Sequence, residues 1–205
     1  MSDIWKLSAQ ETASFIRKRD LSAHDSVGAA LARLNAVNPK LNAVVEPMAE
    51  TALKQAKALD QLQADGGSLG PLHGVPVTIK INIDQEGCAT SNGVVAFKDI
   101  IAQADAPVVE NLRKAGAVII GRTNTPEFSF RADTQNSLFG RTHNPWGQHI
   151  SAGGSSGGAG AAVMAGIGAL AHGNDIGGSL RFPAAANGAV TLKPGLGRVP
   201  AWNVS

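Results

Sequence analysis

The chain has 205 residues, an apolar fraction of 43% and a formal net charge of +2, values typical of a globular protein with its own core. Its 18 basic residues are scattered along the chain, so the basic stripe expected of a nucleic-acid-binding protein is missing. The first ten residues lack the pattern of a signal peptide, and the longest apolar stretch, residues 157–171, is shorter than the roughly 20 residues of a membrane helix. A single cysteine, Cys88, cannot form an internal disulfide or a zinc site, and it favours a cytoplasmic location.

Residues 1–65 are predicted to form an N-terminal helical segment. Ser8 and Glu11 have the spacing of a capping box, and Ser22 with Asp25 forms a weaker version of the same signal. Pro39 is expected to end the helix that follows Ser22. The apolar residues that recur at helical spacing in that helix are Val27, Ala30, Leu31, Leu34 and Val37.

The chain then changes character and begins to alternate helices with strands. A third helix over residues 48–62 is followed by a loop, and the β-branched run "VPVTIK" at 75–80 is typical of a strand. Residues 107–115 are predicted to form a helix that Gly116 caps, and "AVII" at 117–120 a buried strand. Helix and strand in alternation indicate a layered α/β fold.

Glycine is concentrated in the last third of the chain, where ten of the 26 residues from Gly153 to Gly178 are glycines. Average usage of about 7% would give roughly two. The stretch "AGAAVMAGIGALA" at 159–171 is predicted to form a helix with a face of small residues. Because glycine destabilises a helix by up to about 1 kcal/mol per residue, we expect close packing to compensate and the helix to be deeply buried.

Two adjacent serines, Ser155 and Ser156, lie inside this glycine-rich frame, and several interpretations are open. A glycine loop that binds phosphate is disfavoured, because the lysine of the P-loop motif is absent. The motif G-x-S-x-G matches at both serines, yet no histidine follows Asp175 to complete the triad order of an α/β-hydrolase. Taken alone, Ser155 is most simply a helix cap.

A third interpretation uses Ser179, which follows Gly177 and Gly178. Successive N–H groups of such a segment can form a nest for a developing oxyanion, with Ser179 as the nucleophile. Such a serine needs a base, and a lysine can serve when burial lowers its pKa. Lys80, at the end of an apolar strand, is the candidate for this base.

These motifs resemble the amidase signature family of serine hydrolases. The matching pieces are "GPLHGVPVTIK", "GRTNTPEFSF", "GGSSGGAGAA", "HGNDIGGSLRFPAAANG" and "LKPGLGRV", which together span about residues 70–200. The resemblance implies an α/β fold with a mixed central sheet covered by helices on both faces. It also implies that residues 66–205 are the N-terminal portion of the family's catalytic domain, because the chain is shorter than that domain. One departure is Ile81, which follows Lys80 where the family usually has an acidic residue.

Carried over residue by residue, the resemblance implies a Ser-Ser-Lys triad. Ser179 is then the nucleophile, Ser155 the bridging serine after a cis peptide bond from Gly154, and Lys80 the base. Ser156 is implied to support the network around Lys80. The implied oxyanion-hole N–H groups belong to Ile176, Gly177, Gly178 and Ser179.

Asp175 and Arg181 flank the same loop, and Arg181 could either pair with Asp175 to brace the loop or reach the substrate. We favour bracing.

The activity implied by the resemblance is hydrolysis of carboxamide bonds in small-molecule amides through an acyl-enzyme on Ser179, with no metal or organic cofactor. Two alternatives are a glutaminase subunit of a tRNA-dependent amidotransferase and a truncated remnant without catalysis. The resemblance also implies, as possible partners, a second copy of the chain or a complementing C-terminal half.

Overall fold

The computed structural model describes residues 3–200, and its N-terminal part is mainly helical. A short 3-10 helix, η1 (Ile4–Lys6), precedes the helices α1 (Ala9–Lys18), α2 (Ala23–Leu41) and α3 (Ala49–Ala64). Ser8 forms the predicted capping box, because its hydroxyl accepts from the Glu11 N–H while its own N–H donates to Glu11 Oε2. Ser22 caps α2 by accepting a hydrogen bond from the Asp25 N–H at 2.9 Å.

The prediction that Pro39 ends the second helix is wrong by two residues. Pro39 lies inside the final turn of α2, which continues to Leu41. So close to the helix end, a proline removes one N–H donor without interrupting a long run of hydrogen bonds. The helix ends at Asn42, which adopts a left-handed conformation (φ 50°) and donates its N–H to the Asn38 carbonyl at 2.7 Å.

The core of the fold is a four-stranded mixed sheet. Its strands are β1 (Val44–Pro47), β2 (Pro76–Lys80), β3 (Val118–Thr123) and β8 (Leu170–Ala171), in the order β1-β3-β2-β8. The strands β2, β3 and β8 run parallel, while β1 is antiparallel to β3. Every residue of β2 and β3 is buried, as expected for strands covered on both faces.

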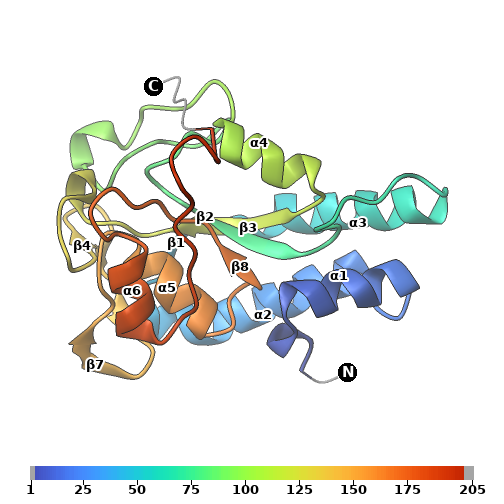
Figure 1. The fold of residues 1–205 in the computed structure, drawn as a ribbon, viewed down its shortest axis with the longest axis horizontal. Coiled ribbons are helices and arrows are strands. Elements are labelled where there is room, and N and C mark those ends of the chain that lie inside the picture. The colour runs from blue at the N-terminus through green and yellow to red at the C-terminus, as the bar shows by residue number, and fades with distance from the viewer. Residues whose placement is uncertain (1–2, 201–205) are drawn as a thin grey trace.

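Helices cover both faces of this sheet. On one side α4 (Pro107–Lys114) packs Val109 against the β2 and β3 residues Val77 and Ile119. On the other side α2, α3 and α5 (Gly157–Met164) pack against Val118 and Ile120 of β3. Figure 1 shows α4 above the sheet, with α2 and α5 below it. The predicted α/β class, with a mixed sheet covered on both faces, is confirmed.

Smaller elements complete the described chain. The 3-10 helices η2 (Val95–Phe97) and η3 (Glu127–Ser129) lie in loops, and α6 (Arg181–Asn187) packs against α5. Two short hairpins pair β4 (Gln135–Asn136) with β5 (Gly140–Arg141) and β6 (His143–Asn144) with β7 (Gly147–Ser151). Among residues 3–200, no helix combines the length and the apolar character that crossing a membrane requires.

The glycine-rich helix is buried as predicted, but it is shorter than predicted. Every residue from 157 to 162 is buried. The helix ends after Met164 because Gly166 and Gly168 both have positive φ angles, and the chain then enters β8. The helix predicted at 107–115 ends at Lys114 with Ala115 as its cap, and Gly116 follows with a φ of 86°.

Candidate active site

The carboxyl ends of the three parallel strands meet at one edge of the sheet, where open α/β folds place their ligand sites. Lys80 is the last residue of β2 and pairs with Thr123, the last residue of β3. Thr125 lies two residues beyond β3, and Asn174 lies three residues beyond β8. The topology therefore brings together polar residues that are far apart in the sequence.

Lys80 is fully buried at this edge, with no exposed surface. Its Nζ atom donates to Ser155 Oγ at 2.7 Å and to Asn174 Oδ1 at 2.8 Å. Burial disfavours the charged ammonium and lowers the pKa of Lys80 to about 7, although the Asp175 carboxylate acts in the opposite direction. An amine in this state can accept a proton near neutral pH.

A chain of neutral polar groups surrounds the lysine contact. The side chains of Asn174 and Asn82 donate to each other, from Nδ2 of one to Oδ1 of the other, over 3.1 and 3.3 Å. Asn82 also donates to Ser129 Oγ, which lies 3.0 Å from Thr125 Oγ1. The Thr125 hydroxyl in turn donates to the main-chain carbonyl of Ser155.

Four residues of this hydrogen-bond network were not singled out from the sequence: Asn82, Thr125, Ser129 and Asn174. In the structure Asn82, Thr125 and Asn174 each follow a strand end by two or three residues, but only the strand before Asn82 was predicted with the end that it has.

The glycines around the two serines allow a close approach of backbone segments. The peptide bond between Gly154 and Ser155 is cis. A Cβ atom on Gly154 would lie 2.2 Å from the Arg131 carbonyl oxygen, and one on Gly158 would lie 2.4 Å from the Asn124 nitrogen. Neither position has room for a side chain, which explains why both residues are glycine.

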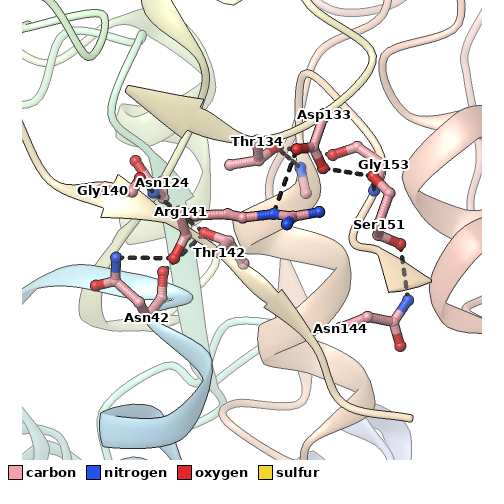
Figure 2. Close-up of polar contacts among 11 residues, drawn as sticks. Asn42, Asn124, Asp133, Thr134, Gly140, Arg141, Thr142, Asn144, Ser151 and Gly153 are labelled. Atoms are coloured by element: carbon pink, nitrogen blue, oxygen red, sulfur yellow. Dashed lines mark hydrogen bonds and ion pairs between the residues drawn. The ribbon is translucent and has the colours of Figure 1, made fainter. Parts of the chain in front are cut away.

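Hydrogen bonds hold the segment just before the serines in place (Figure 2). Ser151, at the end of β7, donates its hydroxyl to Asp133 Oδ1 at 2.5 Å and accepts from the Gly153 N–H at 2.9 Å. Asn144 donates to the Ser151 carbonyl, and the Thr134 hydroxyl donates to the Gly153 carbonyl. The backbone leading into Ser155 is therefore fixed from both sides.

Ser156 contacts the surroundings of Lys80 without touching the lysine itself. Its hydroxyl donates to the Asn174 carbonyl at 3.4 Å, and its N–H donates to the Ser179 carbonyl at 3.2 Å. Ser156 is also the residue that precedes α5, but its side chain forms no capping hydrogen bond. Ser155 Oγ accepts from Lys80. In this structure, therefore, neither hydroxyl caps the glycine-rich helix.

The loop of residues 176–179 lies beside this network. The Ser179 carbonyl reaches Ser156, while within the described chain the Ser155 and Ser179 hydroxyls share no hydrogen bond. The Gly178 N–H donates to Asp175 Oδ1 at 2.7 Å. The N–H groups of Ile176 and Gly177 have no acceptor among residues 3–200, and both residues are exposed.

Asp175 organises the turn that carries Ser179. Its side chain is fully buried, and Arg181 contacts it with two nitrogens, Nε and Nη2, each at 3.0 Å. The Leu180 N–H donates to the same carboxylate. These hydrogen bonds, led by the one from Arg181, hold the pKa of Asp175 well below its usual range.

His172 is close enough to Lys80 to be affected by its charge, but its surroundings keep the imidazole neutral. Burial, with a smaller effect of Lys80, lowers the pKa of His172 to about 4. Its Nδ1 atom has no hydrogen-bond partner in the described structure. No group of three or more His, Cys, Asp or Glu side chains among residues 3–200 could hold a metal ion.

Comparison with known proteins identifies the family. Residues 25–205 match the family model named Amidase. The chain belongs to the amidase family. This confirms the resemblance inferred from the glycine and serine motifs.

Two relatives and one solved structure show how far the similarity of this amidase-family chain extends. It is 60% identical over 202 residues to an indoleacetamide hydrolase of Bradyrhizobium diazoefficiens, covering 98% of this chain and 38% of the relative. It is 40% identical to a glutamyl-tRNA(Gln) amidotransferase subunit of Moorella thermoacetica, covering 98% of this chain and 42% of that relative. A solved structure of a fatty acid amide hydrolase superposes with a TM-score of 0.87 at 35% identity, covering 90% of this chain and 32% of that protein. The chain thus spans about two fifths of the length of these curated relatives.

Proposed function

We propose that this amidase-family chain carries the catalytic groups for hydrolysis of a carboxamide bond, with Ser179 as nucleophile, Ser155 as proton relay and Lys80 as base. The observation that carries the proposal is the buried hydrogen bond of 2.7 Å between Lys80 Nζ and Ser155 Oγ. A buried lysine with a lowered pKa beside a hydroxyl is the arrangement that base catalysis by an amine requires.

In the proposed reaction, neutral Lys80 accepts the proton of Ser155 as Ser155 accepts the proton of Ser179. The Ser179 oxygen then forms a bond to the carbonyl carbon, and the carbonyl π electrons move to its oxygen. When the C–N bond breaks, the leaving nitrogen receives a proton back through Ser155. Water next attacks the acyl-enzyme, releases the carboxylic acid and restores the Ser179 hydroxyl.

The developing oxyanion would be stabilised by backbone N–H groups of the loop before Ser179. The N–H groups of Ile176 and Gly177 have no acceptor in the described chain and are available for this role. The Gly178 N–H is already bound to Asp175, so its proposed contribution requires it to share or exchange that acceptor. The paired Asp175 and Arg181 would keep the turn in place during the reaction.

For the substrate, we propose a small primary carboxamide with an aromatic group, in line with the relative named an indoleacetamide hydrolase. The test is ammonia release from indole-3-acetamide by the purified chain, with Ser179→Ala as the matched variant. The proposal expects ammonia from the wild-type chain and a loss of about 10³-fold or more in the variant. Equal ammonia release by both proteins would contradict the role of Ser179.

A second candidate function is that of a glutaminase subunit in a tRNA-dependent amidotransferase, which the relative from Moorella thermoacetica favours. This function predicts hydrolysis of glutamine that increases when partner subunits are added, whereas the first predicts hydrolysis of the aromatic amide without them. A folded chain that hydrolyses neither amide under either condition would support the third possibility, a remnant without catalysis. The native mass of the purified chain in solution tests whether a second copy binds. Repeating the measurement with a complementing C-terminal half added tests that partner.

A further inference from the structure

We propose that Asn174 is a positioning residue that directs the Lys80 amine toward Ser155 while keeping a negative charge out of contact with it. The inference rests on the proposed function, in which Lys80 is the base. Asn174 is not a member of the proposed triad, and the inference follows from the contacts of its side chain.

The Asn174 amide oxygen restricts the rotation of the Lys80 amine. A neutral amine has two N–H bonds and one lone pair, whereas an amide oxygen can only accept. The contact of 2.8 Å therefore takes one N–H of Lys80. In the structure Nζ also donates to Ser155 Oγ at 2.7 Å, so the lone pair of a neutral amine takes the third staggered direction. A turn of one third about the Cε–Nζ bond brings the lone pair to Ser155 Oγ while an N–H still points at Asn174.

Asn174 is itself held so that its oxygen, and not its nitrogen, faces the lysine. Its Nδ2 atom donates to Asn82 Oδ1 at 3.1 Å, which sets the orientation of the amide. The Ser156 hydroxyl donates to the main-chain carbonyl of Asn174 at 3.4 Å and holds the backbone. Asn82 is anchored in turn by Ser129 at 3.0 Å. A flipped amide would lose the contact with Asn82 Oδ1 and would present two donors to the lysine.

The charges around Lys80 explain why a neutral acceptor matters. Both hydrogen-bond partners of Lys80 are uncharged, a hydroxyl and an amide. From the segment after β8, the titratable groups that interact with it are Asp175, whose carboxylate is bound by Arg181, and His172, which burial keeps neutral. From β3, the Arg122 guanidinium is directed away, toward Glu46 and the carbonyls of the β2–η2 segment.

A carboxylate at position 174 would therefore change the base directly. Asn174→Asp keeps the size of the side chain and places a negative charge in contact with the ammonium. An opposite charge at this range shifts a pKa by about 1–3 units, in this case upward. Asn174→Leu removes the acceptor while keeping the site dry, so it shifts the Lys80 titration in the opposite direction.

The test is an NMR pH titration of the folded chain with lysine labelled with ¹³C at Cε. The Lys80 resonance is identified by its absence in Lys80→Met. We expect Lys80 to titrate about 1–3 pH units higher in Asn174→Asp and lower than wild type in Asn174→Leu. The matched control, Asn82→Asp, places the same charge on the next residue of the polar chain, so its upward shift should be smaller.

Equal shifts in Asn174→Asp and Asn82→Asp would overturn the inference, because the charge would then act as a general field and not through the contact. Should Asn174→Asp fail to fold, an unchanged Lys80 titration in Asn174→Leu would overturn it equally well. The titration needs no turnover, so it is separate from the test of the proposed function. Failure of the wild-type chain to hydrolyse any amide would refute the function, while the titration would still report whether Asn174 controls Lys80.

Discussion

Lys80 Nζ lies 2.7 Å from Ser155 Oγ, although 75 residues separate the two in the sequence. The contact exists because β2 ends at Lys80 while the loop before α5 turns over the same edge of the sheet. Both side chains are buried, so the hydrogen bond forms away from water. A buried amine in this position should make both the proposed reaction and the stability of the chain sensitive to pH.

The pH dependence of acylation should report the titration of Lys80. Only the neutral amine can accept a proton, and the pKa of Lys80 is lowered to about 7 by burial. The rate of acylation should therefore fall about tenfold per pH unit below about pH 7 and reach a plateau above it. Measuring the acylation rate from pH 5 to 9 checks this.

A matched pair of variants identifies the base behind that profile. Lys80→Met should slow acylation by about 10³-fold or more at pH 7 to 9, whereas His172→Ala should leave the acid limb of the profile where it is. Loss of acylation in a folded His172→Ala variant would assign the role of base to the histidine instead.

The stability of the chain should also depend on Lys80. A lysine whose pKa is lower in the folded state than its ordinary value of about 10.4 binds its proton more readily when unfolded, so folding becomes more favourable as the pH rises between the two values. The slope contributed is about 1.4 kcal/mol per pH unit over that range. Lys80→Met should remove this contribution, which urea unfolding at pH 7, 8 and 9 measures. Parallel stability curves for the two proteins would contradict the buried-lysine account.

The glycine frame should tolerate no side chain at Gly158. A Cβ atom there would meet the Asn124 nitrogen at 2.4 Å, so Gly158→Ala should destabilise the fold by about 1–3 kcal/mol. Gly28, inside α2, is the control, because nothing lies within 4 Å of a Cβ atom at that position. Gly28→Ala should stabilise by about 0.5–1 kcal/mol through helix propensity. Chemical unfolding of both variants checks the contrast, and a similar effect at the two sites would contradict it.

The Asp175 carboxylate should contribute to stability in a pH-dependent way. Its folded-state pKa is lowered, chiefly by Arg181, so its contribution is present above the unfolded value of about 3.9 and is lost as the pH falls below it. Asp175→Asn should therefore lower the melting temperature at pH 7, with a smaller difference from wild type at pH 3. A difference that stays constant between the two pH values would show that the carboxylate's charge is not what stabilises the turn.

The parts of the fold with strong local signals could be predicted from the sequence. The helix caps at Ser8 and Ser22 are where they were predicted, because a cap depends only on neighbouring residues. The buried run at 75–80 matches β2 to within one residue, whereas β3 continues three residues beyond the predicted end at 120. The strand β1 gave no such signal, because its four residues are held by pairing with the distant β3. The length of the glycine-rich helix was overestimated because small residues at helical spacing continue past Gly166, where a positive φ ends the helix.

The site was predictable only in part. Lys80 and the glycine-framed serines stand out because a lysine at the end of an apolar strand and serines among glycines are unusual. Asn82, Thr125 and Asn174 could not be selected in the same way, because asparagine and threonine are common after strands. Their importance comes from parallel strands that bring three strand ends to one edge, and that topology is a long-range property.

The most direct test of the central claim is labelling of the purified chain with a fluorophosphonate, followed by peptide mapping. The account predicts that the label is found on Ser179, that it is absent in Ser179→Ala, and that Lys80→Met reacts at a rate reduced by about 10³-fold or more. A label on Ser155 or Ser156, or no label on folded wild-type chain, would contradict the assignment of Ser179 as the nucleophile of this chain.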